Sequence, residues 1–214
     1  MDEQPFRQPD LSPQEIRSRS RAFTIGLLGV LEGALALLAM GIGYFIGFSP
    51  IRNLHWSTQS LLLGLLAVVP MVFVFCFSVR SNWHPVRRIR IFLLRRVMPM
   101  FEGQPGAVLL VSLLAGIGEE VFFRGLIQAG LHSWIGGWIG LCVGLLFGSG
   151  LFGLLHSASR MYMISAAVFG LYFGLLLLWT DNLLVPIIAH AVYDCIVLYY
   201  YLILRQMYLK RRAI

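Results

Sequence analysis

The chain has 214 residues, of which 58% are hydrophobic and only 13% charged, and its mean hydropathy is +0.77. This composition excludes an ordinary soluble domain, in which about a quarter of the residues are charged. A membrane span takes about 20 apolar residues, so the length suits a single bundle of five to seven spans. The net charge of +7 does not indicate nucleic acid, because the arginines cluster in short segments between apolar runs, as in loops that face anionic lipid.

The N-terminal part begins with a polar segment, residues 1–21, which we predict to lie beside the membrane. Within it, Ser12 and Glu15 have the spacing of a helix capping box and open a short basic helix. The apolar run that follows, residues 22–48, is too long for the core of a cleavable signal peptide and is predicted as the first span. Glu32 lies inside this span without an assigned partner, and we expect it to form a structural hydrogen bond with another helix.

Five further apolar runs predict a total of six spans: 60–79, 106–130, 138–156, 161–179 and 183–204. Residues 80–96 alternate arginines with apolar residues, which is typical of an amphipathic segment on the membrane surface. A cytoplasmic N-terminus leaves Arg52 as the one arginine in the outer loops and therefore satisfies the positive-inside rule. We predict a multi-pass protein of a bacterial inner membrane, with an embedded domain over 22–204 and a basic tail over 205–214.

Small residues recur at every fourth position in two of the spans: Gly140, Gly144 and Gly148, then Ala166, Gly170 and Gly174. Such stripes allow helices to approach closely in lipid, where association depends on packing rather than on water exclusion. The three cysteines are scattered through apolar runs and predict neither a disulfide framework nor a thiolate metal site: Cys76, Cys142 and Cys195.

Ionisable residues gather in three of the spans, where each is costly to bury and therefore a candidate functional residue. Glu120 and Arg124 are four residues apart and predict an ion pair on one helix face, which leaves Glu119, about 100° away, without that partner. His190 and Asp194 are also four residues apart, so the carboxylate can orient the imidazole.

His156 continues the face of the glycine stripe in the fourth span through Phe152 and is predicted to point into a helix interface. One carboxylate without a cationic partner and two histidines can hold a water molecule, remove its proton and stabilise an oxyanion. These groups therefore suit peptide hydrolysis, although each could also belong to a buried structural network.

Three short motifs follow one another on the third, fourth and sixth spans: Glu119-Glu120-x-x-x-Arg124, Phe152-x-x-x-His156 and His190-x-x-x-Asp194. In this order they resemble the motifs of the CAAX-protease and bacteriocin-processing (CPBP, or ABI) family of glutamic intramembrane proteases. The resemblance covers about residues 106–198, the expected catalytic core. It implies water activation by Glu119 and His156 and an oxyanion site at His190 and Asp194, with the other motif residues in support.

The resemblance implies a membrane-associated or prenylated protein or peptide as substrate. We expect no cofactor, with zinc as the alternative. One departure concerns Asp194, where the eukaryotic prenyl-protein endopeptidases of the family carry asparagine. An ionised aspartate cannot donate a hydrogen bond to an oxyanion. Asp194 is therefore either protonated by its apolar site or limited to orienting His190.

The sequence leaves three alternatives open. A zinc hydrolase could use the same glutamate, histidine and aspartate side chains as ligands, and a catalytically silent immunity or scaffold protein could keep the motifs for packing. A proton-coupled transporter would use the buried carboxylates as a relay, although the sequence has no evident repeat. With all spans in register, moreover, His156 and His190 fall near opposite membrane faces and do not meet.

Overall fold

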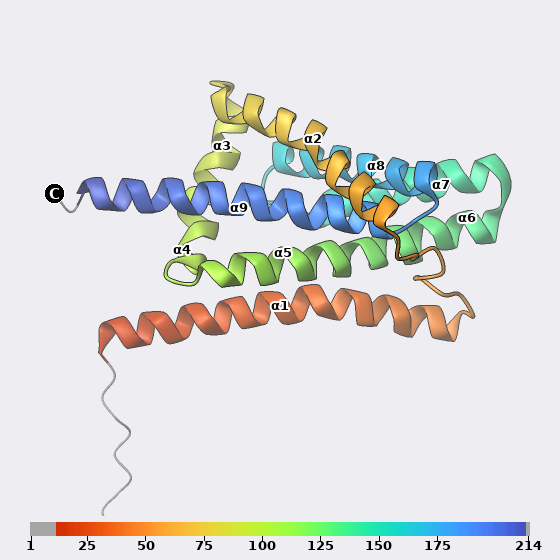
Figure 1. Cartoon of the computed structure of the whole chain (residues 1–214), viewed down its shortest axis with the longest axis horizontal. Coiled ribbons are helices and arrows are strands. Elements are labelled where there is room, and N and C mark those ends of the chain that lie inside the picture. Colours follow the sequence, from red (N-terminus) through yellow and green to blue (C-terminus); the bar gives the residue numbers. More distant parts are fainter. Residues whose placement is uncertain (1–11, 213–214) are drawn as a thin grey trace, which may run out of the picture.

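The computed structural model describes residues 12–212, which are helical apart from short connections and contain no strand (Figure 1). In chain order the elements are α1 (Pro13–Phe45), α2 (Thr58–Arg80), α3 (His84–Phe92), the π-helical η1 (Leu93–Val97), α4 (Met98–Phe101), α5 (Pro105–Glu120), the π-helical η2 (Val121–Gln128), α6 (Ala129–Ile135), α7 (Gly137–Leu155), α8 (Arg160–Thr180) and α9 (Leu184–Arg212).

Six helices of the described part are long and apolar enough to cross a membrane, which confirms the predicted six-span, all-α architecture. The third of them is continuous over α5, η2 and α6. The segment predicted to lie on the membrane surface, residues 80–96, forms α3 and most of η1. With the following α4, these elements run across the long helices rather than along them (Figure 1). The protein is thus a multi-pass membrane protein.

The outer helices extend further than the apolar runs alone indicate. The capping box is present, because Glu15 N–H donates to Ser12 Oγ and Ser12 N–H donates to the Glu15 carboxylate. The hydrogen bond from the Ser12 side chain, and secondarily that from its backbone, holds the pKa of Glu15 below its ordinary value.

The basic segment and the first span form one 33-residue helix, and α9 likewise continues through the basic tail to Arg212. Residues 1–11 of the predicted polar segment lie outside the described residues.

The bundle is organised around α9, which packs between α2 and α5, while α1 covers the other side of α5 (Figure 1). Two glycines on α5 permit these close approaches. A Cβ at Gly116 would lie 2.7 Å from Ala191 Cβ on α9, and a Cβ at Gly118 would lie only 1.9 Å from the backbone oxygen of Glu32 on α1. The residue that follows Gly118 is therefore held tightly between two helices.

The predicted small-residue stripes also lie in close contacts. A Cβ at Gly144 would lie 2.4 Å from the Gln128 backbone oxygen, and one at Gly170 would lie 3.2 Å from Ser149 Cα. Through these contacts α7 packs against both η2 and α8. A backbone oxygen of the second stripe also accepts a buried hydrogen bond, since the Gln128 side chain donates to Gly174 O at 3.0 Å.

The helices are staggered along the long axis, and this decides which residues meet. Figure 1 shows α6 and α7 reaching beyond the α8–α9 turn at one end, and α9 reaching beyond α7 and α8 at the other. The turn itself is fixed by Asn182, whose amide donates to His55 O and Ser60 Oγ, both at 2.7 Å. Because the sixth span is offset in this way, an arrangement with all spans in register is wrong.

Candidate active site

Two adjacent carboxylates and an arginine lie at the junction of α5 and η2. Glu119, Glu120 and Arg124 are 7%, 0% and 1% exposed, respectively. The wider turn of a π-helix is rare and occurs frequently at functional sites. Here it follows directly on the two glutamates and carries Arg124. All three charged groups are therefore placed inside the bundle, where each needs partners.

The predicted ion pair within this motif is present. Arg124 Nε lies 3.2 Å from Glu120 Oε2, and Arg124 Nη2 donates to Gly170 O on α8 at 2.8 Å. The guanidinium carbon also lies 4.6 Å from the ring centre of Phe152 and 5.3 Å from that of Phe173. Arg124 thus connects η2, α7 and α8 through charge, a hydrogen bond and cation–π contacts.

His190 is held from both of its ring nitrogens. Its Nδ1 lies 2.8 Å from Glu120 Oε1, and its Nε2 lies 3.5 Å from Asp194 Oδ2. The ring stacks on Phe173, with 4.8 Å between centroids. The predicted one-turn contact with Asp194 is therefore present, but the shorter contact is with Glu120. Since both partners are carboxylates, only a ring with hydrogen on both nitrogens donates to both.

His156 ends α7 and presents one nitrogen to Glu119. Its Nδ1 lies 2.8 Å from Phe152 O, and a carbonyl only accepts, so this nitrogen carries the hydrogen in the neutral ring. The other nitrogen, Nε2, then has its lone pair directed toward Glu119 Oε1 at 3.7 Å. The ring stacks on Phe152 with a centroid separation of 4.5 Å. Phe152 therefore fixes the position of His156 by both its backbone and its ring.

Glu119 lies between the two histidines without a direct hydrogen bond to either. Its Oε1 is 3.7 Å from His156 Nε2 and its Oε2 is 3.9 Å from His190 Nε2, both too long for a hydrogen bond. Polar atoms separated in this way are suited to bridging by water. As predicted, no arginine of the described chain pairs with Glu119, but the carboxyl group of Glu32 lies within hydrogen-bonding reach of it.

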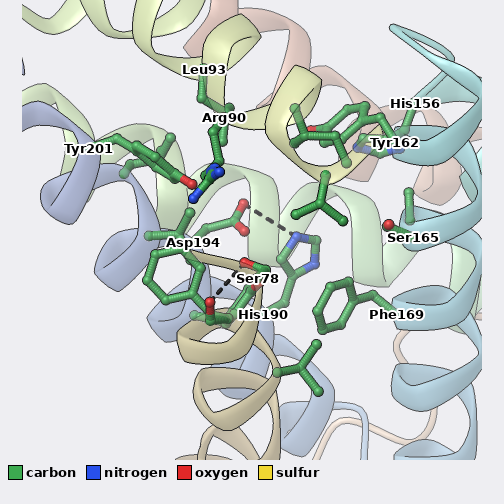
Figure 2. A pocket seen from close by; sticks show the side chains of 18 of the residues that line it. Ser78, Arg90, Leu93, His156, Tyr162, Ser165, Phe169, His190, Asp194 and Tyr201 are labelled. Carbon is green, nitrogen blue, oxygen red and sulfur yellow. Dashed lines mark hydrogen bonds and ion pairs between the residues drawn. The ribbon is translucent and has the colours of Figure 1, made fainter. Parts of the chain in front are cut away.

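A cavity of about 240 Å³ opens onto the two histidines and Asp194. Figure 2 shows His190 and Asp194 on one side of it and His156 with Tyr162 on another. Apolar side chains of α2, α3, α8 and α9 form most of the remaining wall. Arg90 of α3 also lines it, fixed by hydrogen bonds to Val79 O and, at 2.8 Å, to Ser81 O. The polar groups therefore lie at the base of a largely apolar cavity.

Comparison with known proteins identifies the part of the chain that carries these residues. Residues 101–196 match the family described as type II CAAX prenyl endopeptidase Rce1-like. The match covers slightly less than half of the chain, and these residues are similar to the Rce1-like family. The CPBP resemblance seen in the three motifs is thereby confirmed, since the Rce1-like proteins are part of it. The matched residues include every predicted site residue and exclude α1, α2 and α3.

One relative of this chain is the protein YpbD of Bacillus subtilis (strain 168), described as uncharacterized. It is 32% identical over 89 residues, which cover 42% of this chain and 42% of YpbD. The aligned part thus spans less than half of the relative's length. No solved structure gives a significant match.

Some residues of the site are not evident from the sequence. Phe173 stacks on His190, and Tyr162 lies with its ring 6.0 Å from that of His156. An aromatic residue between Gly170 and Gly174 in a small-residue stripe is the available signal for Phe173. The sequence indicates no role for Arg90 beyond its place in a basic amphipathic segment. The residues that face it across the cavity come from other helices, so spacing along the chain does not reveal them.

Metal binding has no separate support from the geometry. Within residues 12–212, no group of three or more histidine, cysteine, aspartate or glutamate side chains has the arrangement of a metal site. The expected absence of a cofactor nevertheless stays a prediction, which metal analysis of the purified protein can test.

Proposed function

We propose that the protein is an intramembrane endopeptidase of the CAAX type, which hydrolyses a peptide bond with water activated by Glu119 and His156. One observation carries the proposal: the Glu119 carboxylate faces an imidazole nitrogen on each side, at 3.7 and 3.9 Å. These gaps suit a water molecule on one side and a substrate carbonyl on the other. The similarity of residues 101–196 to the Rce1-like family supports the same reaction.

In the proposed mechanism, the attacking water donates one hydrogen to Glu119 and the other to His156 Nε2. Glu119 accepts the proton as the water oxygen forms a bond to the peptide carbonyl carbon. The oxyanion that develops is stabilised by the Nε2–H of His190, which Glu120 holds in place through Nδ1. Glu119 then returns the proton to the leaving amine as the C–N bond breaks, and both substrate halves are released.

The substrate class follows from the surroundings of the polar groups. The apolar wall formed by α2, α3, α8 and α9 suits a lipidated or membrane-inserted segment rather than a soluble polar peptide. We therefore propose a membrane-associated or prenylated protein or peptide as substrate. The wall brings the apolar part of such a substrate within reach of His156 and His190.

The proposal is tested with purified protein in liposomes and two sets of peptides, matched in sequence, of which one is prenylated. Cleavage of the prenylated set, with release of the C-terminal fragment, is the expected result. Activity that disappears on metal chelation and returns with zinc would instead support the zinc hydrolase. Failure to cleave any peptide of the panel, or a membrane protein substrate, would leave the silent immunity or scaffold function.

Asp194→Asn tests the role of the residue that departs from the family pattern. We expect kcat to fall about tenfold, equivalent to about 1.4 kcal/mol in the barrier, because the change removes the negative charge that lies 3.5 Å from the His190 ring. The measurement is the pH–rate profile of the variant beside the wild type. A fully active variant with a flatter alkaline limb would instead assign oxyanion donation to a protonated Asp194, and identical profiles would remove Asp194 from the mechanism.

A further inference from the structure

Glu32 is a partly buried acid, with its Oε2 atom buried, and it lies outside the matched segment and outside all three motifs. It lies near the middle of α1, where α1 and α5 approach closely because Gly118 has no side chain to separate the two backbones. This approach brings the Glu32 side chain within hydrogen-bonding reach of Glu119, the residue after Gly118. α1 therefore supplies a second carboxyl group to the proposed water-activating residue.

If both carboxyl groups are ionised, each has a buried oxygen that accepts no hydrogen bond from the described residues. Glu32 Oε2 and Glu119 Oε2 are buried, and neither receives a hydrogen bond from a donor in residues 12–212. Two carboxylates in contact also repel each other strongly away from water. A single proton between them removes both problems, because a carboxylic acid donates to a carboxylate in a short, strong hydrogen bond.

We propose that Glu32 is a positioning residue that shares one proton with Glu119 and holds its carboxylate toward His156 and His190. The inference rests on the proposed peptidase function. With the proton on Glu32, Glu119 is free to take a second proton from the attacking water. Glu119 passes that proton to the leaving amine, and the pair again holds one proton. No other reactant is needed.

The other charged and titratable groups around the pair are on different helices. Glu119 faces His156 at the end of α7, His190 and Asp194 on α9, Tyr162 on α8, and the Glu120–Arg124 ion pair beside it. Glu32 faces the same two α9 residues at longer range. Each of the nearby carboxylates of Glu120 and Asp194 has a cationic or imidazole partner, whereas Glu32 has the Glu119 carboxyl group.

The first test compares Glu32→Gln with Glu32→Leu in the liposome assay. The glutamine amide can donate to Glu119 permanently, so this variant should keep kcat within about threefold of the wild type. Leucine cannot donate, and kcat should fall at least about tenfold with little change in KM, because Glu119 loses its orientation. The control is Leu35→Ala. It reduces side-chain packing in the same α1–α5 contact but removes no carboxyl group, so kcat should be unchanged.

A second test does not depend on catalysis. Infrared spectroscopy of the wild type should show the C=O stretch of a buried protonated carboxyl group, and this band should be absent from the isosteric Glu32→Gln variant. A band that persists in this variant would overturn the shared proton, as would wild-type kcat in Glu32→Leu or equal losses in both variants. If no peptide is cleaved by the wild type, the proposed function fails, and the infrared comparison still decides whether the proton is shared.

Discussion

Glu119→Ala is expected to lower the rate of peptide cleavage by about 10²–10⁴-fold, the usual contribution of a general base. In the proposed mechanism this side chain accepts the proton of the attacking water, and no other carboxylate of the described chain lies between the two histidines. His156→Ala should cause a loss of the same order, because His156 Nε2 holds the second hydrogen of that water. The quantity to measure is kcat in liposomes.

Two controls separate lost chemistry from lost structure. Glu15→Ala removes a glutamate from the exposed start of α1 and should retain wild-type turnover. The double variant lacking both Glu119 and His156 should be about as slow as either single variant, because residues that act as one unit are strongly non-additive. Wild-type turnover in either single variant, with an unchanged Tm, would exclude the proposed pair.

Arg124→Ala is expected to destabilise the protein by about 3–5 kcal/mol, because it leaves Glu120 buried without its cationic partner. The change also removes the donor to Gly170 O and the cation that packs against Phe152. The measurement is unfolding in detergent, followed by heat or denaturant. Arg88→Ala, an exposed change on α3, should shift stability by less than about 0.5 kcal/mol.

A compensating change distinguishes the ion pair from simple packing. Glu120→Gln removes the unpaired charge and still offers an oxygen to His190 Nδ1, so in combination with Arg124→Ala it should recover part of the lost stability. A double variant that unfolds no later than Arg124→Ala alone would show that the charge of Glu120 is not what makes the single change costly.

The features that the sequence alone determines are those that depend on neighbours along one helix. The length of an apolar run is set by the thickness of the bilayer, so the runs by themselves predict the six spans. A helix brings residues four apart onto one face, and the pairs Glu120 with Arg124 and His190 with Asp194 follow from that spacing. The capping box at Ser12 is local in the same way.

Contacts between helices were decided only by the tertiary structure. The offset of the sixth span brings His190 to the level of Glu119 and His156, and no property of any single span specifies this offset. Glu120 has its 2.8 Å contact with His190, 70 residues away, as well as its predicted ion pair. Glu32 finds Glu119 only because Gly118 lets two helices meet. The stagger and rotation of helices relative to one another depend on how side chains from distant segments fit together. The periodicity within one helix does not depend on that fit, so it can be read from the sequence.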